Sequence, residues 1–161
     1  MKLLKPTPLT EASFRPYGDI IETTDTPSSI INNGNCLRFN DLVTLDIDSS
    51  GKAGISLFDA KAYSSPLKLS YVERHPLGSQ SFIPMTRDRY LVIAADDIND
   101  AAQEPQVFLA DGTQGVSYKR NVWHGVLTPI VEPALFAVVD YIGEQNNLEE
   151  FEFENPYLIE F

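Results

Sequence analysis

Several residue types are scarce in this sequence, and their scarcity narrows what the protein can be. The 161 residues include one cysteine, Cys36, so no disulfide can form within the chain. No apolar run approaches the roughly 20 residues that a membrane-spanning helix needs. Pro6 and Pro8 interrupt the amino-terminal segment before an apolar run develops. We therefore expect a cytoplasmic protein without a membrane partner.

Basic residues are also in short supply. Twelve Lys and Arg residues face 23 Asp and Glu residues, which gives a net charge of -11. A surface that binds phosphates needs a basic cluster, and this chain has none. Nucleic acids and anionic membranes are therefore excluded as main partners, and small molecules or proteins are favoured. The length and the 43% hydrophobic content fit one domain that spans residues 1–161.

Long amphipathic helices are missing as well, and short strand-like segments take their place. These segments are rich in β-branched and aromatic residues, and they cover residues 55–63, 67–74, 81–85, 90–95, 105–110, 115–127 and 134–142. Turn residues such as Gly, Pro, Asn and Asp separate them. The pattern predicts a mostly-β barrel or sandwich.

The segments around these strands carry more local signals. Residues 10–15, TEASFR, favour a short helix with Thr10 as its N-cap and Pro16 as its stop. Asn32, Asn33 and Gly34 indicate a turn, and residues 96–104 are expected to form an exposed, mobile loop. The tail at 151–161, FEFENPYLIEF, alternates acidic and apolar residues and can cover a strand edge.

Chemically versatile groups are concentrated in the stretch ERHPLGSQ, residues 73–80. If the preceding segment is a strand, Leu69, Tyr71, Glu73 and His75 share one face. The carboxylate and the imidazole then lie about 7 Å apart, at the end of an apolar face. This arrangement predicts a buried pocket with a polar mouth.

The other histidine in the chain follows the same alternation. In YKRNVWHG, the residues Tyr118, Arg120, Val122 and His124 have one parity, so His124 is predicted to face the interior that Glu73 faces. Trp123 has the opposite parity and is expected to be a packing residue. Both histidines are thus expected at one cavity.

The spacing of these groups resembles the cupins, whose first motif has the form H-x-H-x4-E and whose second motif supplies one further His. Glu73, His75 and Gln80 stand at the three positions of the first motif, and His124 follows. The resemblance implies a single cupin-like β-barrel, also called a double-stranded β-helix or jelly roll, with short flanking helices. It also implies a site for a divalent cation such as Ni, Mn, Fe or Zn.

Each of these residues also has a structural interpretation. A single His in a β protein is more often a hydrogen-bonded structural residue than a ligand. Gln80 can cap the turn that precedes it, and Arg74 can pair with an acidic neighbour. Asp140 ends an apolar strand, where it either supports the site or lies exposed at the strand end.

Beyond this general pattern, the chain resembles the ureidoglycolate lyases of allantoin and purine catabolism along nearly its whole length. The resemblance rests on LTEASFRPYGDII, INNGNCLRFNDL, ERHPLGSQSFIPM, GVSYKRNVWHGVL, FAVVDYIG and NNLEEF. It implies a carbon–nitrogen lyase that splits ureidoglycolate into glyoxylate and urea, and a homodimer. The chain departs from the family where members often have W-H-H-P, because Gly125 and Val126 follow His124 here. It also has Tyr141 where an Arg often follows the late Asp.

The implied reaction needs a base for the hydroxyl proton and an acid for the departing nitrogen. The resemblance therefore implies catalytic roles for three residues, Glu73, His75 and His124. It implies metal ligation by Glu73, His75, Gln80 and His124. Which group is the base and which is the acid stays open, because a metal or an unligated side chain can each accept the first role.

The carboxylate of the implied substrate also calls for a cation, and Arg is the better two-pronged partner. The expected substrate-binding residues are Arg38, Arg74, Gln80 and Asp140. Arg38 is favoured as the cation because Arg74 has the opposite parity from the ligand face. Two alternatives stay open: a related cupin enzyme for another small α-hydroxy or α-keto acid, and a barrel that binds such a metabolite without turnover.

Overall fold

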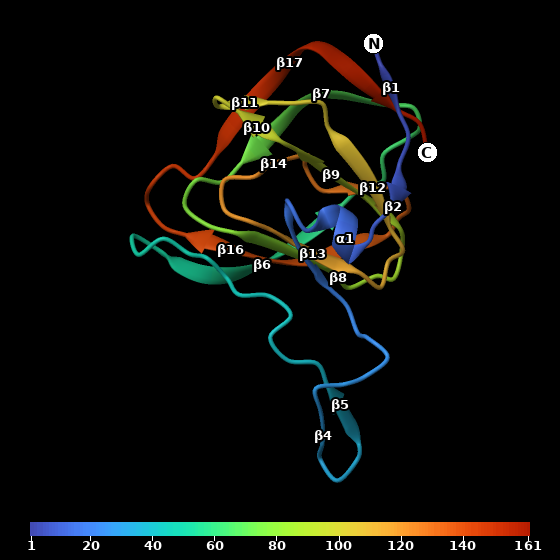
Figure 1. The fold of residues 1–161 in the computed structure, drawn as a ribbon, viewed down its shortest axis with the longest axis vertical. Coiled ribbons are helices and arrows are strands. Elements are labelled where there is room, and N and C mark those ends of the chain that lie inside the picture. The colour runs from blue at the N-terminus through green and yellow to red at the C-terminus, as the bar shows by residue number, and fades with distance from the viewer.

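Two β-sheets face each other and curl into an open barrel (Figure 1) in the computed structural model, which describes residues 1–161. The larger sheet contains β1 (Leu3–Leu4), β2 (Thr7–Pro8), β7 (Leu67–Arg74), β9 (Tyr90–Ala95), β12 (Gln106–Ala110), β14 (Trp123–His124), β15 (Thr128–Pro129) and β17 (Glu149–Ile159). The smaller sheet contains β3 (Gly18–Ile21), β6 (Lys52–Ala60), β8 (Gln80–Pro84), β13 (Gly115–Tyr118) and β16 (Ala134–Ile142).

The strand order confirms the predicted mostly-β, cupin-like barrel. The larger sheet runs β1-β17-β7-β14-β9-β12-β2, with β15 also paired to β9, and the smaller sheet runs β3-β13-β8-β16-β6. Two hairpins lie outside these sheets, β4 (Ser29–Ile31) with β5 (Cys36–Arg38), and β10 (Asp97–Ile98) with β11 (Ala101–Ala102). The smaller sheet ends in β6, which therefore has one unpaired edge.

Aromatic side chains fill the space between the sheets. Phe14, Phe82, Phe108 and Phe136 are all buried there, and their rings meet neighbouring rings mostly edge to face. β9 is buried along its whole length because one of its faces joins this core while the other packs against a second apolar cluster. Its uninterrupted apolar sequence, YLVIAA, reflects this position.

The predicted helix and the predicted tail both form. The helix is α1 (Glu11–Phe14), and the Thr10 hydroxyl accepts a hydrogen bond from the Ser13 amide in a capping box. No helix in the chain is long and apolar enough to cross a membrane. The tail becomes most of β17, which pairs antiparallel with β7 and so covers a strand edge.

The segment 115–127 is broken into two strands, whereas the alternation argument treated it as one. β13 belongs to the smaller sheet and β14 to the larger one. A turn joins them, in which Asn121 has a φ of +65° and donates its amide hydrogen to the His75 carbonyl. The chain thus crosses from one sheet to the other just before His124.

The hairpin of β4 and β5 projects away from the barrel (Figure 1). Asn32, Asn33 and Gly34 form its turn with φ values of 55°, 56° and 88°, which confirms the predicted turn. Asn and Gly suit these positions because they tolerate the left-handed region better than other residues do.

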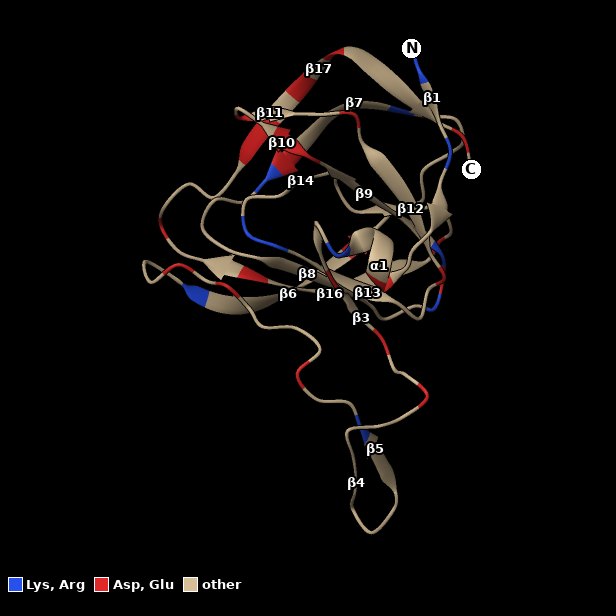
Figure 2. Ribbon diagram, viewed as in Figure 1, with Lys and Arg blue, Asp and Glu red and all other residues tan.

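The segment 96–104 is exposed from Asp96 to Asp100, as predicted, but it is not an irregular loop. It folds into the β10–β11 hairpin, in which Ala102 is buried. The Arg74 guanidinium fixes this hairpin, because it bonds Asp97 at 2.8 Å and Asp100 at 3.1 Å. The same guanidinium bonds Glu149 on β17 at 2.6 Å, next to the other acidic residues of β10 and β17 (Figure 2).

Trp123 completes this cluster, and its predicted packing role is confirmed. The Arg74 guanidinium carbon lies 4.3 Å from the centre of the Trp123 ring, and the indole donates a hydrogen bond to Asp97. Carboxylates around Arg74 raise its pKa above the ordinary value even though burial acts in the opposite direction. The cluster ties β7, β10, β14 and β17 together on the outer face of the larger sheet.

This arrangement predicts that Arg74→Met destabilises the fold, because three carboxylates lose their common partner. Part of the acidic set is exposed, so we expect a loss of about 1–3 kcal/mol in the free energy of unfolding. Lys68→Met, an exposed cation on the same strand, is the matched control and should change little. Thermal denaturation measures both. Unchanged stability together with weaker substrate binding would instead assign Arg74 to the substrate.

Candidate functional site

Glu73, His75 and His124 gather at one end of the barrel. One carboxylate oxygen and one ring nitrogen from each histidine all lie within 4.8 Å of one another. Strand pairing accounts for this proximity, because His124 on β14 stands directly opposite Glu73 on β7. Side chains paired in this way point to the same face of a sheet. The sequence therefore correctly brought these three groups together.

His124 is buried with one polar atom unsatisfied. Only 1% of the residue is exposed, and Nδ1 lies 2.9 Å from the Gly125 carbonyl oxygen. A carbonyl can only accept, so Nδ1 carries the proton and Nε2 carries a lone pair. Nε2 has no hydrogen-bond partner. Buried polar atoms are rarely left unpaired in folded proteins, and this one points to a bound group.

The protonation state of His124 follows from its surroundings. Burial lowers its pKa to about 3, and the neighbouring His75 adds to the effect. The imidazole also stacks on the Tyr118 ring, with centroids 4.3 Å apart. His124 is therefore a neutral, immobilised acceptor at physiological pH and does not act as a proton donor.

His75 and Gln80 present a second unusual pair of atoms. His75 Nδ1 donates to the Asn147 carbonyl oxygen at 2.7 Å, so Nε2 bears the lone pair in the neutral ring. Nε2 lies 3.2 Å from Gln80 Oε1, which is also an acceptor. The amide nitrogen of Gln80 donates to Asp140 on β16, which fixes this orientation. Two lone pairs thus face each other.

These donors fit a divalent cation. Two imidazole nitrogens, a carboxylate oxygen and an amide oxygen form a mixed nitrogen and oxygen set of the kind that Zn, Ni, Mn and Fe accept. A cation would satisfy Nε2 of His124 and would remove the repulsion between His75 and Gln80. The Glu73 carboxylate lies 3.8 Å from His75 Nε2 and completes the set.

Glu73 is the remaining member of the set. Burial raises its pKa above the ordinary value, the carboxylate of Glu150 adds to the rise, and the charge of His75 opposes it. A raised pKa makes this carboxyl a better proton acceptor than a solvent-exposed one. Glu73 therefore suits both cation binding and proton exchange.

The sequence suggested two arginines as substrate-binding residues, and the structure places both of them away from this cluster. Arg74 points to the opposite face of β7 and is held by its acidic partners. Arg38 lies on β5, in the projecting hairpin, far from β7 and β14 of its own chain (Figure 1). Two other cations near the motifs are also bound, Arg120 to Asp46 and Asp48, and Lys119 to the Arg15 carbonyl.

Sequence reasoning missed Asn147. Its carbonyl sets the tautomer of His75, and its side-chain oxygen accepts the Leu77 amide hydrogen at 2.6 Å. Asn147 is 72 residues from His75, and no local spacing connects them. Only the return of the chain before β17 brings the two together.

The two departures from the family pattern lie beside the cluster. A Cβ atom at Gly125 would lie 2.9 Å from the Ile93 Cβ, so a larger residue there requires Ile93 to shift. Tyr141 follows Asp140 but points to the other face of β16, where its hydroxyl lies 3.1 Å from the Ser50 hydroxyl. Neither residue contributes an atom to the donor set.

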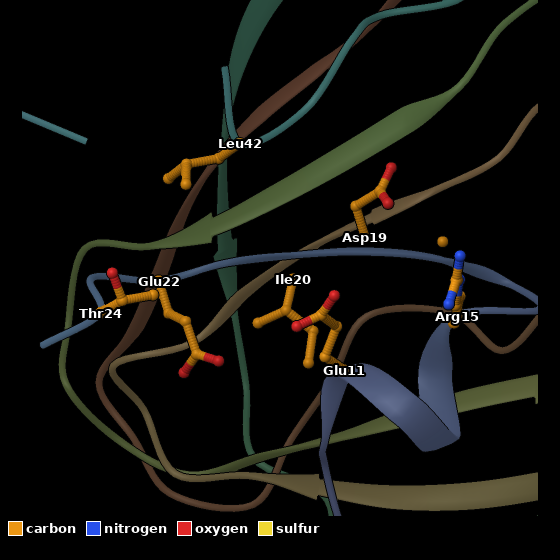
Figure 3. Close-up of a pocket in the computed structure, with 8 residues that line it drawn as sticks. Glu11, Arg15, Asp19, Ile20, Glu22, Thr24 and Leu42 are labelled. Carbon is orange, nitrogen blue, oxygen red and sulfur yellow. The ribbon is translucent and has the colours of Figure 1, made fainter. Parts of the chain in front are cut away.

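A hollow of about 430 Å³ lies between α1 and β3, away from the cluster (Figure 3). It is lined by Glu11, Arg15, Gly18, Asp19, Ile20, Glu22, Thr24 and Leu42. Its Glu22 carboxylate accepts a hydrogen bond from Gln114, and no lining residue has an unsatisfied buried atom. The cluster at Glu73 is therefore the better candidate site.

The raised pKa of Glu73 predicts a pH-dependent effect of Glu73→Gln in chelator-treated protein. The folded state favours the protonated carboxyl, so stability from this group is present below its unfolded pKa and is lost as the pH rises through its folded pKa. Glu73→Gln should raise the melting temperature at about pH 7.5 and lose that advantage near about pH 4. Glu152→Gln, on exposed β17, is the control. A pH-independent difference would contradict the assigned environment.

Comparison with known proteins agrees with this geometry. The sequence matches the ureidoglycolate lyase family over residues 1–160. It is 47% identical to a ureidoglycolate lyase of Rhodobacter capsulatus, and the match covers 99% of each chain. It is 46% identical to one of Chelativorans sp. over 94% of this chain and 93% of the relative. It is 43% identical to ureidoglycolate lyase 2 of Rhizobium meliloti over 96% and 95%. The chain belongs to the ureidoglycolate lyase family.

Proposed function

We propose that this protein, acting as one domain over residues 1–161, cleaves ureidoglycolate into glyoxylate and urea in the cytoplasm, as part of allantoin degradation. The observation that carries the proposal is the unpartnered Nε2 of His124, which faces Glu73 and His75 in a chain of this family. The active form is proposed to be a homodimer.

The reaction needs proton transfer but no added water. Ureidoglycolate carries a hydroxyl, a carboxylate and a urea nitrogen on one carbon. The hydroxyl loses its proton as the carbonyl of glyoxylate forms, the C–N bond breaks, and the nitrogen leaves with one added proton. A single group can take the first proton and return it to the nitrogen, which balances the reaction.

Glu73 is the best candidate for this transfer. Its buried carboxyl has a raised pKa, and it lies within the donor cluster. His124 has a pKa of about 3 and cannot hold the proton at neutral pH, so its role is to accept. His75 is fixed by Asn147 and shares the site as a ligand or hydrogen-bonding partner.

A divalent cation, if bound, would be held by Glu73, His75, Gln80 and His124. It would supply positive charge that favours deprotonation of the substrate hydroxyl. Asp140 positions Gln80 through the hydrogen bond at 3.2 Å. Gln80 and Asp140 would then orient the polar groups of the substrate near Glu73.

The substrate carboxylate still requires a cation. Arg74 is neutralised by three carboxylates on the other face of β7. We therefore propose Arg38 for the substrate carboxylate, because its guanidinium forms no ion pair within the chain; the eight ion pairs present involve other residues. Arg38 lies far from the cluster of its own chain, so this role requires a second copy of the chain.

Incubation of the purified protein with ureidoglycolate tests the proposed reaction. Urea and glyoxylate should appear in equal amounts, and heat-inactivated protein should not accelerate their release. Related α-hydroxy and α-keto acids should bind more weakly in a thermal-shift series. Ligand-induced stabilisation without product would favour a metabolite-binding barrel, and turnover of another acid would favour a related enzyme.

Substitution of each histidine separates catalysis from stability. His124→Ala and His75→Ala should each lower kcat/KM about a hundredfold or more, while unfolding free energy falls by about 1–2 kcal/mol. Val92→Ala, in the core and outside the cluster, should lose comparable stability and keep its turnover. Metal analysis of the same preparations should show both histidine variants losing any bound cation together. Near-normal turnover in both variants would make the histidines structural.

A further inference from the structure

The projecting segment between β3 and β6 is bonded to its own barrel only near its two ends, through Glu22 to Gln114 and through Asp46 to Ser79 and Arg120. We call residues 22–46 the arm. Hydrogen bonds made by residues 24–40 connect members of the arm only to one another. Figure 1 shows the β4–β5 hairpin at the far end of the arm, clear of both sheets. An arm of this length without a contact surface would not be expected to hold one conformation by itself.

The arm is apolar where a free hairpin would be polar. Its exposed large apolar residues are Ile30, Ile31, Leu37, Leu42 and Leu45, and Ile30 is 62% exposed. An exposed hydrophobic surface of this kind marks an interaction site. The arm therefore has the composition of a segment that packs against another surface.

The same chain has a second unpartnered apolar surface, at β6. Ile55 is 75% exposed and Leu57 is 63% exposed, and both point outward. The neighbouring strands extend this apolar surface, because Leu57 pairs with Ala137 on β16 and Ala137 pairs with Ile83 on β8. We call Ile55, Leu57 and Ile83 the β6 surface. The free edge of this nine-residue strand can also accept backbone hydrogen bonds.

Charge links the two surfaces to the candidate site. Arg38 is the only cation in the arm (Figure 2), whereas the donor cluster contains Glu73 and is bordered by Asp140. β6 reaches this border directly, because Gly54 pairs with Asp140. A basic side chain carried along β6 would thus arrive at an acidic site that has no free cation of its own.

We infer that the arm of each protomer docks along β6 of a second copy of this chain and brings Arg38 to the partner's donor cluster. A strand that adds to an open sheet edge gains backbone hydrogen bonds and buries apolar side chains together. Two copies can exchange arms symmetrically, so that both β6 edges are covered. The catalytic role of Arg38 rests on the proposed function, whereas the docking of the arm does not.

Photocrosslinking tests the docking without any assay of activity. Cys36 is the only cysteine and lies on β5 next to Leu37, so a benzophenone maleimide placed there reports what the arm contacts. Crosslinks should join two chains and map to residues 52–60. Crosslinks within one chain, to other strands, or to nothing would overturn the docking.

Leu57→Asp supplies a variant for the same measurement. A buried carboxylate at the docked surface is unfavourable, so the crosslink should disappear and sedimentation should shift from dimer to monomer. Ile98→Asp, an exposed apolar position in the β10–β11 hairpin, is the matched control and should stay dimeric and crosslinked. A dimeric, crosslinked Leu57→Asp protein would count against β6 as the docking surface.

Complementation tests whether Arg38 acts across the interface. Arg38→Ala and His124→Ala homodimers should each have little activity. A mixed dimer, purified through two different tags, should regain about half of wild-type turnover, because one of its two sites receives both intact residues. No recovery would place Arg38 elsewhere, as would full activity of Arg38→Ala. If wild-type protein releases no urea, the proposed function fails, and the crosslink still decides the docking.

Discussion

The unsatisfied nitrogen of His124 is the constraint on which the candidate site depends. The ring is buried, stacked on Tyr118 and tied through Nδ1 to the Gly125 carbonyl, so Nε2 has one fixed direction and one fixed protonation state. Leaving such an acceptor unpaired costs on the order of 1–3 kcal/mol. A folded protein tolerates this cost at a place where a ligand or cation completes the site. Glu73, His75 and Gln80 then belong to the same ligand-binding site.

The strand order explains how distant residues reach that place. β7 and β14 are neighbours in the larger sheet and supply Glu73 and His124, while β8 and β16 in the smaller sheet supply Gln80 and Asp140. The site therefore lies where the two sheets come together. The Arg74 cluster acts on the other face of β7, where it holds the strand without touching the donors.

The sequence predicted the parts of this site that depend on regular strands. Alternation placed Glu73 and His75 together because β7 is regularly paired from Tyr71 to Arg74. It was wrong for Leu69, because the pairing with β17 is irregular between Leu69 and Tyr71, and Leu69 packs with Ile93 on the outer face. The same argument placed His124 on the correct side of the sheet. It did not predict the turn at Asn121, where the strand is interrupted because the chain changes sheets. Asn147 and the Arg74 cluster depend on contacts between segments far apart in the sequence, which periodicity does not report. The composition of residues 96–104 likewise did not predict the β10–β11 hairpin, because the bonds to Arg74 hold that hairpin in place.

The two histidines allow the central claim to be measured directly. Nitrogen-15 NMR of the imidazole rings, in the metal-free protein and after addition of Zn²⁺, reports which nitrogen carries the proton and which binds the cation. We expect His124 to be neutral with a bare Nε2 at neutral pH, and Zn²⁺ to shift the Nε2 resonances of His124 and His75 together. A protonated Nε2 in His124, or two rings that do not respond to Zn²⁺ or to glyoxylate, would contradict this account of the site.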